Sequence, residues 1–178
     1  SDLANYSFSS PSRHATPSPP FPDGNAIERA ADMLAGAEFP LIVTRSAGRM
    51  EKDVAKLTAL AERFAIPVFE RKHHYMSMPW SSPMHLGANP ESYFDMADVI
   101  VVLEADVPWV PKHKAPKPGT KIIHIGADPI FANYPLRGFV CDLAITGVVG
   151  GTLPALEQAL AAREKTAAAR DAARRAKI

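Results

Sequence analysis

The sequence has almost no cysteine, almost no net charge and no long apolar run. Cys141 is the single cysteine, which excludes an internal disulfide and a multi-cysteine zinc site and fits a reducing compartment. Lys and Arg number 20 and Asp and Glu 19, so nothing points to nucleic acid or an anionic membrane as a partner. No apolar run approaches the roughly 20 residues of a membrane-spanning helix. We therefore expect a cytoplasmic protein.

Serine and proline dominate the first 22 residues, and such a segment cannot bury a core. We predict that residues 1–22 are an interdomain linker and that the chain is a piece of a longer polypeptide. The 178 residues, 47% of them hydrophobic, suffice for one domain of typical size. We expect that domain at residues 23–162, followed at 163–178 by a basic, solvated helical extension toward a further C-terminal domain.

Short apolar runs alternate with amphipathic segments along the chain. Strands are predicted at residues 40–44, 66–69, 99–103, 121–125 and 139–143, and helices at 25–36, at 51–65 and, capped by Thr152, at 152–177. This alternation is typical of a parallel sheet built by crossover connections. The runs lack polar alternation, which indicates strands covered on both faces. The prediction is a Rossmann-like three-layer α/β/α fold with a mostly parallel sheet of about six strands.

Ligands of such sheets bind beyond the carboxyl ends of the strands, so the loops after strands are the candidate sites. In TRSAGR, after the first strand, Arg45, Ser46 and Gly48 could meet a phosphate, although a plain connecting loop explains the segment as well. In HIGADP, Gly126 and Asp128 could bind a ribose, or Asp128 could simply start a turn. The sequence thus offers a nucleotide-type site with a structural alternative at each loop.

The third strand ends in charge. Glu104 and Asp106 follow the apolar run 99–103, and Pro108 and Pro111 then prevent the next segment from extending the sheet, because each lacks an amide donor. Trp109 could cover the crevice or pack on a neighbouring domain. No histidine pair has the helical spacing of a metal site, and no Gly-x-Ser-x-Gly elbow occurs, so neither a metal site nor a catalytic residue is predicted.

Six phrases in order resemble the central domain of thiamine-diphosphate-dependent enzymes of the acetolactate synthase and benzoylformate decarboxylase type. They are AEFPLIVTRSAGR, LTALAERFAIPVFE, PMHLGANP, ADVIVVLEADVPWVP, PKPGTKIIHIGADP and GFVCDLAITG. Together they span about residues 26–160, and the resemblance implies a fold of the DHS-like NAD/FAD-binding type. It also implies a parent lyase or transferase acting on 2-oxo acids, with flanking pyrimidine-binding and diphosphate-binding domains in the same chain and a homodimeric or homotetrameric assembly.

The resemblance implies thiamine diphosphate and Mg²⁺ in the parent enzyme, bound by the flanking domains. The family's Gly-Asp-Gly motif is absent from this sequence, so the fragment alone is expected to bind neither and to be catalytically inactive. FAD or an adenine nucleotide is the candidate ligand of the central domain itself, and Gly87 joins the candidate contacts because it stands where the family has a Gly-Met-His-Gly loop. Glu104 and Asp106 replace a Gly-Ala-Arg segment of the acetolactate synthases, and carboxylates there disfavour a flavin diphosphate.

Two alternatives remain. One is a free-standing NAD or ADP binding module, such as a sirtuin-like deacylase, but Cys141 alone cannot supply the four zinc-binding cysteines of that family, and no His-Gly occurs. The other is a vestigial domain that serves only in assembly.

Overall fold

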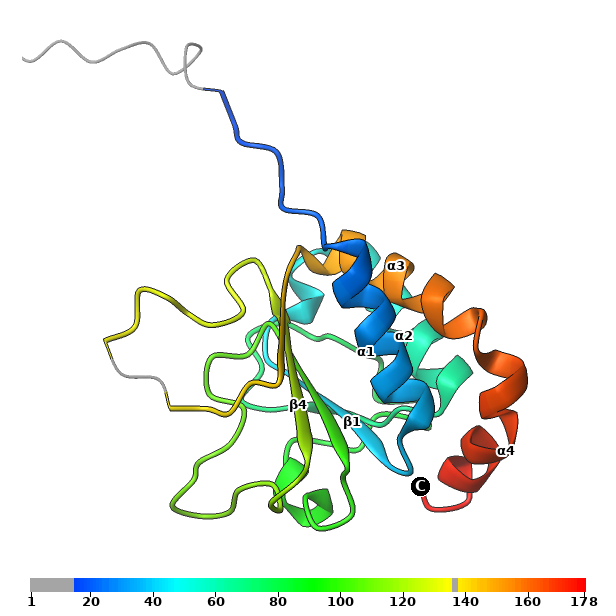
Figure 1. Ribbon diagram of the computed structural model, residues 1–178. Helices are drawn as coiled ribbons and strands as arrows, with labels where there is room; N and C mark the ends of the chain where they lie inside the picture. The colour runs from blue at the N-terminus through cyan, green and yellow to red at the C-terminus, as the bar shows by residue number, and fades with distance from the viewer. Residues whose placement is uncertain (1–14, 136–137) are drawn as a thin grey trace, which may run out of the picture.

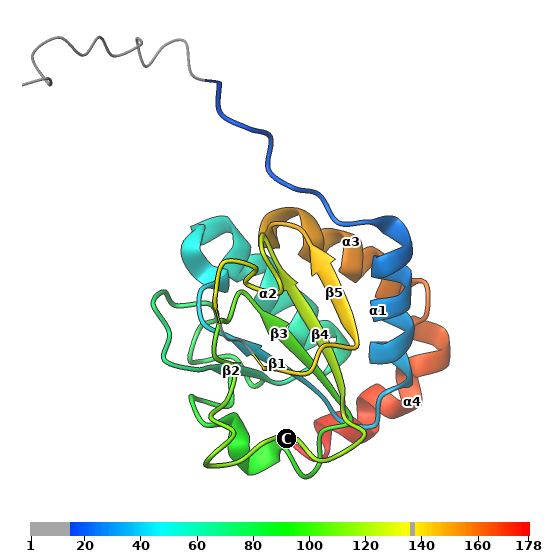
Figure 2. The ribbon, with the colours of Figure 1, turned by 60° about the vertical axis from the view of Figure 1, so that its left-hand side comes forward.

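A single parallel sheet organises the chain. The computed structural model describes residues 15–135 and 138–178; the first 14 residues of the predicted linker lie outside them. Its strands are β1 (Pro40–Thr44), β2 (Val68–Glu70), β3 (Val99–Leu103), β4 (Lys121–Gly126) and β5 (Leu143–Thr146). They pair in the order β2-β1-β3-β4-β5, all parallel (Figure 2). The predicted parallel three-layer α/β fold is confirmed, with five strands in the described residues instead of about six, and with loops and a short 3₁₀ helix in place of the second layer of α-helices.

The four α-helices of the described residues lie on one side of the sheet (Figure 1). They are α1 (Gly24–Gly36), α2 (Glu51–Phe64), α3 (Val149–Ala161) and α4 (Glu164–Arg175). Asp23 caps α1 by accepting a hydrogen bond from the Ala26 amide at 2.9 Å. The apolar faces of α1, α2 and α3 bury one face of the sheet in a core that includes Ile27, Leu34, Leu57, Leu60, Val101, Ile123, Leu153 and Leu156.

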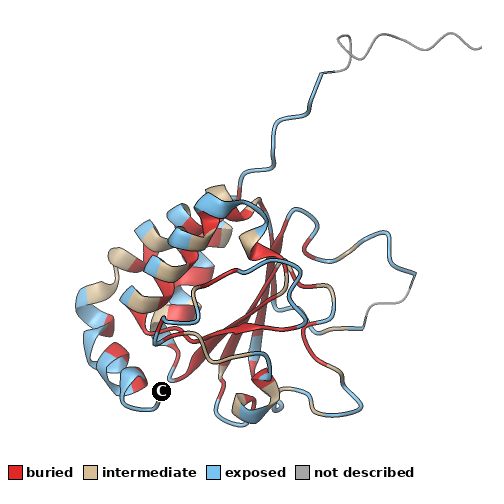
Figure 3. Ribbon diagram, turned by 180° about the vertical axis from the view of Figure 1, so that it is seen from behind, coloured by how far each residue is buried: buried red, intermediate tan, exposed pale blue. Residues whose placement is uncertain are grey.

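Loops and the 3₁₀ helix η4 (Pro90–Tyr93) cover the opposite face of the sheet. Aromatic side chains supply most of the cover: Phe94 and Phe139 pack edge-on against Trp109, at 5.7 and 5.2 Å between ring centroids, and Tyr93 stacks on Phe39. Trp109 is 4% exposed. Every residue of β1 and β3 is therefore buried (Figure 3), as their unbroken apolar runs predicted.

The C-terminal half departs from the predicted boundaries. Helix α3 begins at Val149 and ends at Ala161, so Thr152 is a buried residue inside the helix and not its cap. The Val148 carbonyl accepts hydrogen bonds from the Gly151 and Thr152 amides instead. The sequence did not predict this start because Gly150 and Gly151 lie in the first turn of α3, and glycine disfavours helix in the absence of tertiary packing. The last strand is Leu143–Thr146 and not 139–143.

Helix α4 folds back onto the domain, where a solvated extension was expected. Arg174 is 2% exposed and donates to the Leu34 and Ala37 carbonyls at the end of α1 and to the Phe64 carbonyl at the end of α2. That residues 163–178 lead to a further domain stays a prediction. Among the described residues, none of the helices combines the length and apolar character needed to cross a bilayer.

Candidate functional site

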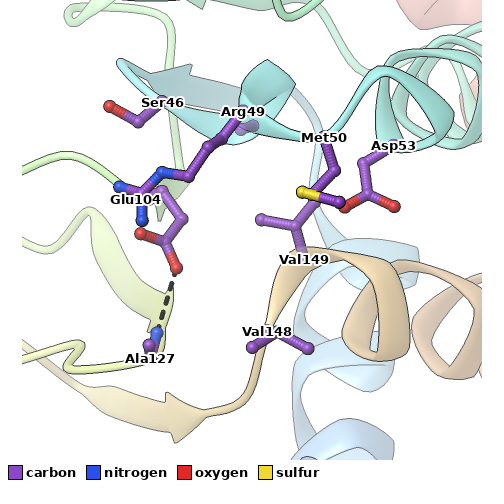
Figure 4. A pocket seen from close by; sticks show the side chains of 9 residues that line it. Ser46, Arg49, Met50, Asp53, Glu104, Ala127, Val148 and Val149 are labelled. Carbon is purple, nitrogen blue, oxygen red and sulfur yellow. Dashed lines mark hydrogen bonds between the residues drawn. The ribbon is translucent and has the colours of Figure 1, made fainter. Parts of the chain in front are cut away.

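A crevice lies at the carboxyl edge of the sheet, where β1 and β3 are neighbours. In the sheet, β2 lies on one side of β1 and β3 lies on the other. The loops that follow β1 and β3 therefore run in opposite directions. Open α/β sheets bind ligands at such a point. The crevice consists of two hollows of about 120 and about 180 Å³, and Ser46, Arg49 and Glu104 line both. Figure 4 shows the first.

Arg45 ties the loop after β1 to the loop after β3. Its Nη1 donates to Asp106 Oδ1 at 2.6 Å, and its Nη2 lies 2.8 Å from His74 Nε2. Burial alone would raise the pKa of Asp106, but hydrogen bonds from Arg45 and from the Val107 amide outweigh that effect and hold the pKa below its usual value. Asp106 is therefore an ionised partner for Arg45, and its negative charge neutralises much of the positive charge of Arg45.

Glu104 joins the ends of β3 and β4. Its Oε1 accepts a hydrogen bond from the Ala127 amide at 3.0 Å. Gly126 allows this approach, because a Cβ at that position would lie 3.2 Å from the same oxygen. The backbone of Glu104 has φ +47°, a left-handed conformation that is costly for a residue with a side chain. The carboxylate thus occupies an amide at the strand end that could otherwise hold an anionic ligand.

Arg49 is the exposed cation of the crevice. It ends the 3₁₀ helix η3 (Ala47–Arg49), and its side chain extends across the first hollow toward Glu104 (Figure 4). Within residues 15–135 and 138–178, no hydrogen bond or ion pair engages its guanidinium.

Asp53 of α2 forms the floor of the first hollow and was not predicted from the sequence. Its side chain is 5% exposed and lies 2.9 Å from Lys56 Nζ, which also donates to the Gly150 carbonyl at 3.0 Å. A Cβ on Gly150 would come within 2.9 Å of Asp53 Oδ1. The first turn of α3 therefore packs directly on this carboxylate, and the positive end of that helix stabilises its charge.

The structure brings together only some of the predicted site residues. Arg45 and Ser46 line the crevice, and Gly126 lies behind Glu104. Gly48 serves close packing instead: a Cβ there would lie 1.8 Å from the Met76 carbonyl oxygen.

Asp128 and Gly87 lie apart from this group. Asp128 accepts a hydrogen bond from the Ala132 amide at 2.9 Å, the contact of a turn-forming residue. Gly87 has φ +85°, and its carbonyl accepts from the Glu70 amide beside β2; it lines neither hollow. Nucleotide binding by the six predicted residues stays a prediction. In the described part of the chain, no cluster of three or more His, Cys, Asp or Glu side chains is suited to a metal ion.

Comparison with known proteins identifies the domain type. The family model described as the central domain of thiamine pyrophosphate enzymes matches residues 27–156, from the first turn of α1 into α3. A sulfoacetaldehyde acetyltransferase from Rhodobacter capsulatus is 35% identical over 68 residues, which are 38% of this chain and 12% of that protein.

Two solved structures share the fold. One, from Mycobacterium smegmatis and described as a thiamin diphosphate-dependent enzyme, has a TM-score of 0.67 at 22% identity over 83% of this chain. The other, a benzoylformate decarboxylase from Polynucleobacter necessarius, has a TM-score of 0.71 at 18% identity over 87% of this chain. In each case the matched part is 30% of the solved chain. The chain therefore spans less than a third of these similar proteins.

Proposed function

This chain belongs to the family of thiamine pyrophosphate enzyme central domains, and from that membership we propose that it is the middle domain of a longer thiamine-diphosphate-dependent lyase or transferase acting on 2-oxo acids. The observation that carries the proposal is the family match, which includes the whole sheet. The names of similar proteins, an acetyltransferase and a decarboxylase, support both reaction classes.

We assign the cofactor of the parent enzyme to its other domains. When bound there with Mg²⁺, thiamine diphosphate would supply the carbanion stabilisation that the reaction needs. This chain lacks the Gly-Asp-Gly motif of the family, and its described residues contain no cluster suited to the metal. The contribution of this domain is spacing and orientation of the flanking domains.

The crevice residues do not fit a flavin diphosphate. Glu104 already accepts the Ala127 amide, Asp106 neutralises Arg45, and the backbone at Met76 fills the space beside Gly48. The two hollows, at about 120 and about 180 Å³, are each smaller than the roughly 300 Å³ of the smallest usual small-molecule sites. We propose that Arg45, Glu104 and Asp106 are already paired within the crevice and that the crevice binds no FAD.

For the parent protein we further propose flanking pyrimidine-binding and diphosphate-binding domains, assembly as a homodimer or homotetramer, and a cytoplasmic location. The family match supports the flanking domains. The single cysteine supports the location.

The complete reading frame tests the parent function. We expect it to encode a Gly-Asp-Gly motif downstream of this chain, and the purified product to decarboxylate a 2-oxo acid only with thiamine diphosphate and Mg²⁺ present. The 178-residue chain under the same conditions is the control and should be inactive. A reading frame without the flanking domains would overturn the proposal.

Flavin titration of the 178-residue chain tests the crevice separately. We expect no saturable quenching of FAD fluorescence. Saturable quenching that Arg45→Ala weakens would show that the crevice is a flavin site after all.

A further inference from the structure

An apolar groove runs along helix α2, and its lining shares no residue with the two hollows of the crevice. Its volume is about 540 Å³. Two acids, Glu51 and Glu62, stand in its wall, and none of its described lining residues is basic. The other lining residues are small or apolar and come from α2 and from the loop after β2: Val54, Ala55, Thr58, Ala59, Met76 and Pro79.

Large apolar side chains beside the groove remain exposed to solvent. Met76, in its wall, is 54% exposed, and so is Met50, which precedes Glu51. Trp80, which follows Pro79, is 70% exposed. Exposed apolar side chains gathered around a groove indicate an interaction site, and methionine and tryptophan are enriched in protein interfaces. We call the groove together with these three side chains the Met76 surface.

Buried polar contacts hold the loop that carries Met76 in place. Glu70, at the end of β2, is 1% exposed, and its Oε1 accepts hydrogen bonds from the Ser77 amide and, at 2.8 Å, from the Met78 amide. The Ser77 Oγ in turn accepts a hydrogen bond from the Gly48 amide at 3.2 Å. A partner therefore does not have to order this loop, which lowers the entropic cost of binding.

The Met76 surface lies beside the point where the predicted linker reaches the domain. The Pro20 carbonyl accepts a hydrogen bond from the Val148 amide at 3.1 Å, and Val148 lines the first hollow together with Met50 (Figure 4). The C-terminal helix ends at the opposite edge of the sheet, where Arg174 donates to the Ala37 carbonyl ahead of β1 (Figure 2). A domain that precedes the linker is therefore tethered closer to this surface than a domain that follows α4.

We propose that the Met76 surface is the docking site of the flanking domain that precedes this one in the parent chain. The inference rests on the proposed function, because that function supplies the preceding domain. The docking face of that domain is apolar with an arginine or lysine at its rim, since the Glu51 carboxylate has no hydrogen bond or ion pair among the residues that the structure describes. The predicted linker gives the tethered domain an effective concentration of about millimolar order, so an interface of modest size suffices.

Oxidative footprinting of the parent protein, expressed from the complete reading frame, tests this surface by comparison with the 178-residue chain. Hydroxyl radicals should oxidise Met76 and Trp80 about fivefold more slowly in the parent, because a docked domain excludes water from the surface. Amine-reactive cross-linking of Lys52, which follows Glu51, should join it to lysines of the preceding domain.

A substitution in the groove should release the docked domain. Ala59→Arg places a long cation on the exposed side of α2, where it fills the groove and repels a basic rim. It should return the oxidation rate of Trp80 in the parent to that of the 178-residue chain, and it should leave the urea midpoint of the 178-residue chain unchanged. Ala168→Arg, the same change at an exposed alanine of α4, is the matched control and should leave Trp80 protected in the parent.

Failure of this inference and failure of the proposed function give different results. A reading frame without flanking domains would overturn the proposed function. A reading frame with a preceding domain, but with equal oxidation of Met76 and Trp80 in the parent and in the 178-residue chain, would overturn the docking site alone. Protection of Trp80 that survives Ala59→Arg, or Lys52 cross-links to the following domain only, would also overturn it. Protection that appears in the 178-residue chain as its concentration rises would make a second copy the occupant.

Discussion

The side chain of Glu104 stabilises the folded state, whereas its backbone conformation destabilises it. Its carboxylate gains a hydrogen bond from the Ala127 amide, while its φ of +47° carries the cost of a left-handed conformation. The charged hydrogen bond contributes about 1–3 kcal/mol, enough to offset the backbone cost. The strand end is thus held by a contact that glycine, the usual residue at such a φ, could not make.

Two substitutions separate these effects. Glu104→Ala loses the hydrogen bond and keeps the backbone cost, whereas Glu104→Gly loses both, so the glycine variant should be more stable than the alanine variant by about 1 kcal/mol in urea denaturation. At Lys52, exposed in α2, the same pair should differ in the opposite direction, because glycine disfavours helix. Greater stability of alanine at position 104 would mean that the conformation is not left-handed in solution.

Asp106 makes stability depend on pH. Its folded-state pKa lies below the usual 3.8, so ionised Asp106 contributes stability above that value and loses it as pH falls through the folded pKa. Asp106→Asn should lower the free energy of unfolding by about 1 kcal/mol at neutral pH, and the difference from wild type should shrink toward pH about 3. Urea denaturation over a pH series measures this. A pH-independent effect of Asp106→Asn would contradict the ion pair.

At the scale of elements, α4 is held by arginines that reach the ends of other helices. Arg174 donates to carbonyls at the ends of α1 and α2 and pairs with Asp171 at 2.7 Å. Burial lowers the pKa of Arg174 and raises that of Asp171, which shows what it costs to bury the pair. Arg174 stabilises the fold because it donates hydrogen bonds to backbone carbonyls that a helix end leaves without partners.

Removing Arg174 should therefore be severe. Arg174→Met leaves Asp171 buried without its partner and should destabilise the chain by about 3 kcal/mol, with loss of hydrogen-exchange protection throughout α4. Adding Asp171→Ala should restore part of the stability, since no charge is then stranded. Arg29→Ala, on the exposed side of α1, is the control and should change stability by less than about 0.5 kcal/mol. Unchanged protection of α4 in Arg174→Met would show that apolar contacts alone hold it.

The elements also show which parts of the molecule the sequence could predict. β1, β3 and β4 were predictable within one residue because each is a short, mainly apolar run whose residues, apart from Lys121 at the start of β4, are all buried. The return of α4 was not, because arginine in a polar helix normally faces water and only the distant carbonyls of α1 and α2 bury it. At the crevice, position after a strand identified Arg45 and Ser46, but the pairing of Arg45 with Asp106 joins loops 61 residues apart. Asp53 had no signal at all, because an acid in the first turn of a helix is ordinary.

At the scale of the whole molecule, two cores share one sheet. The helices bury one face, and aromatic loops bury the other, yet both cores depend on the same strands. β3 contributes Val101 to the first core and Val102 to the second. Loss of either layer exposes apolar residues of the central strands, so the two layers should unfold together.

Trp109 reports on the loop layer alone once Trp80, which is 70% exposed, is replaced. In Trp80→Phe, the fluorescence of Trp109 and the helical circular dichroism should therefore give coincident urea transitions, since the first follows the aromatic layer and the second the helical layer. The replacement itself should cost less than about 0.5 kcal/mol, because the side chain is exposed. If Trp109 fluorescence changed at lower urea than the helical signal, the aromatic layer would be a separate cooperative unit.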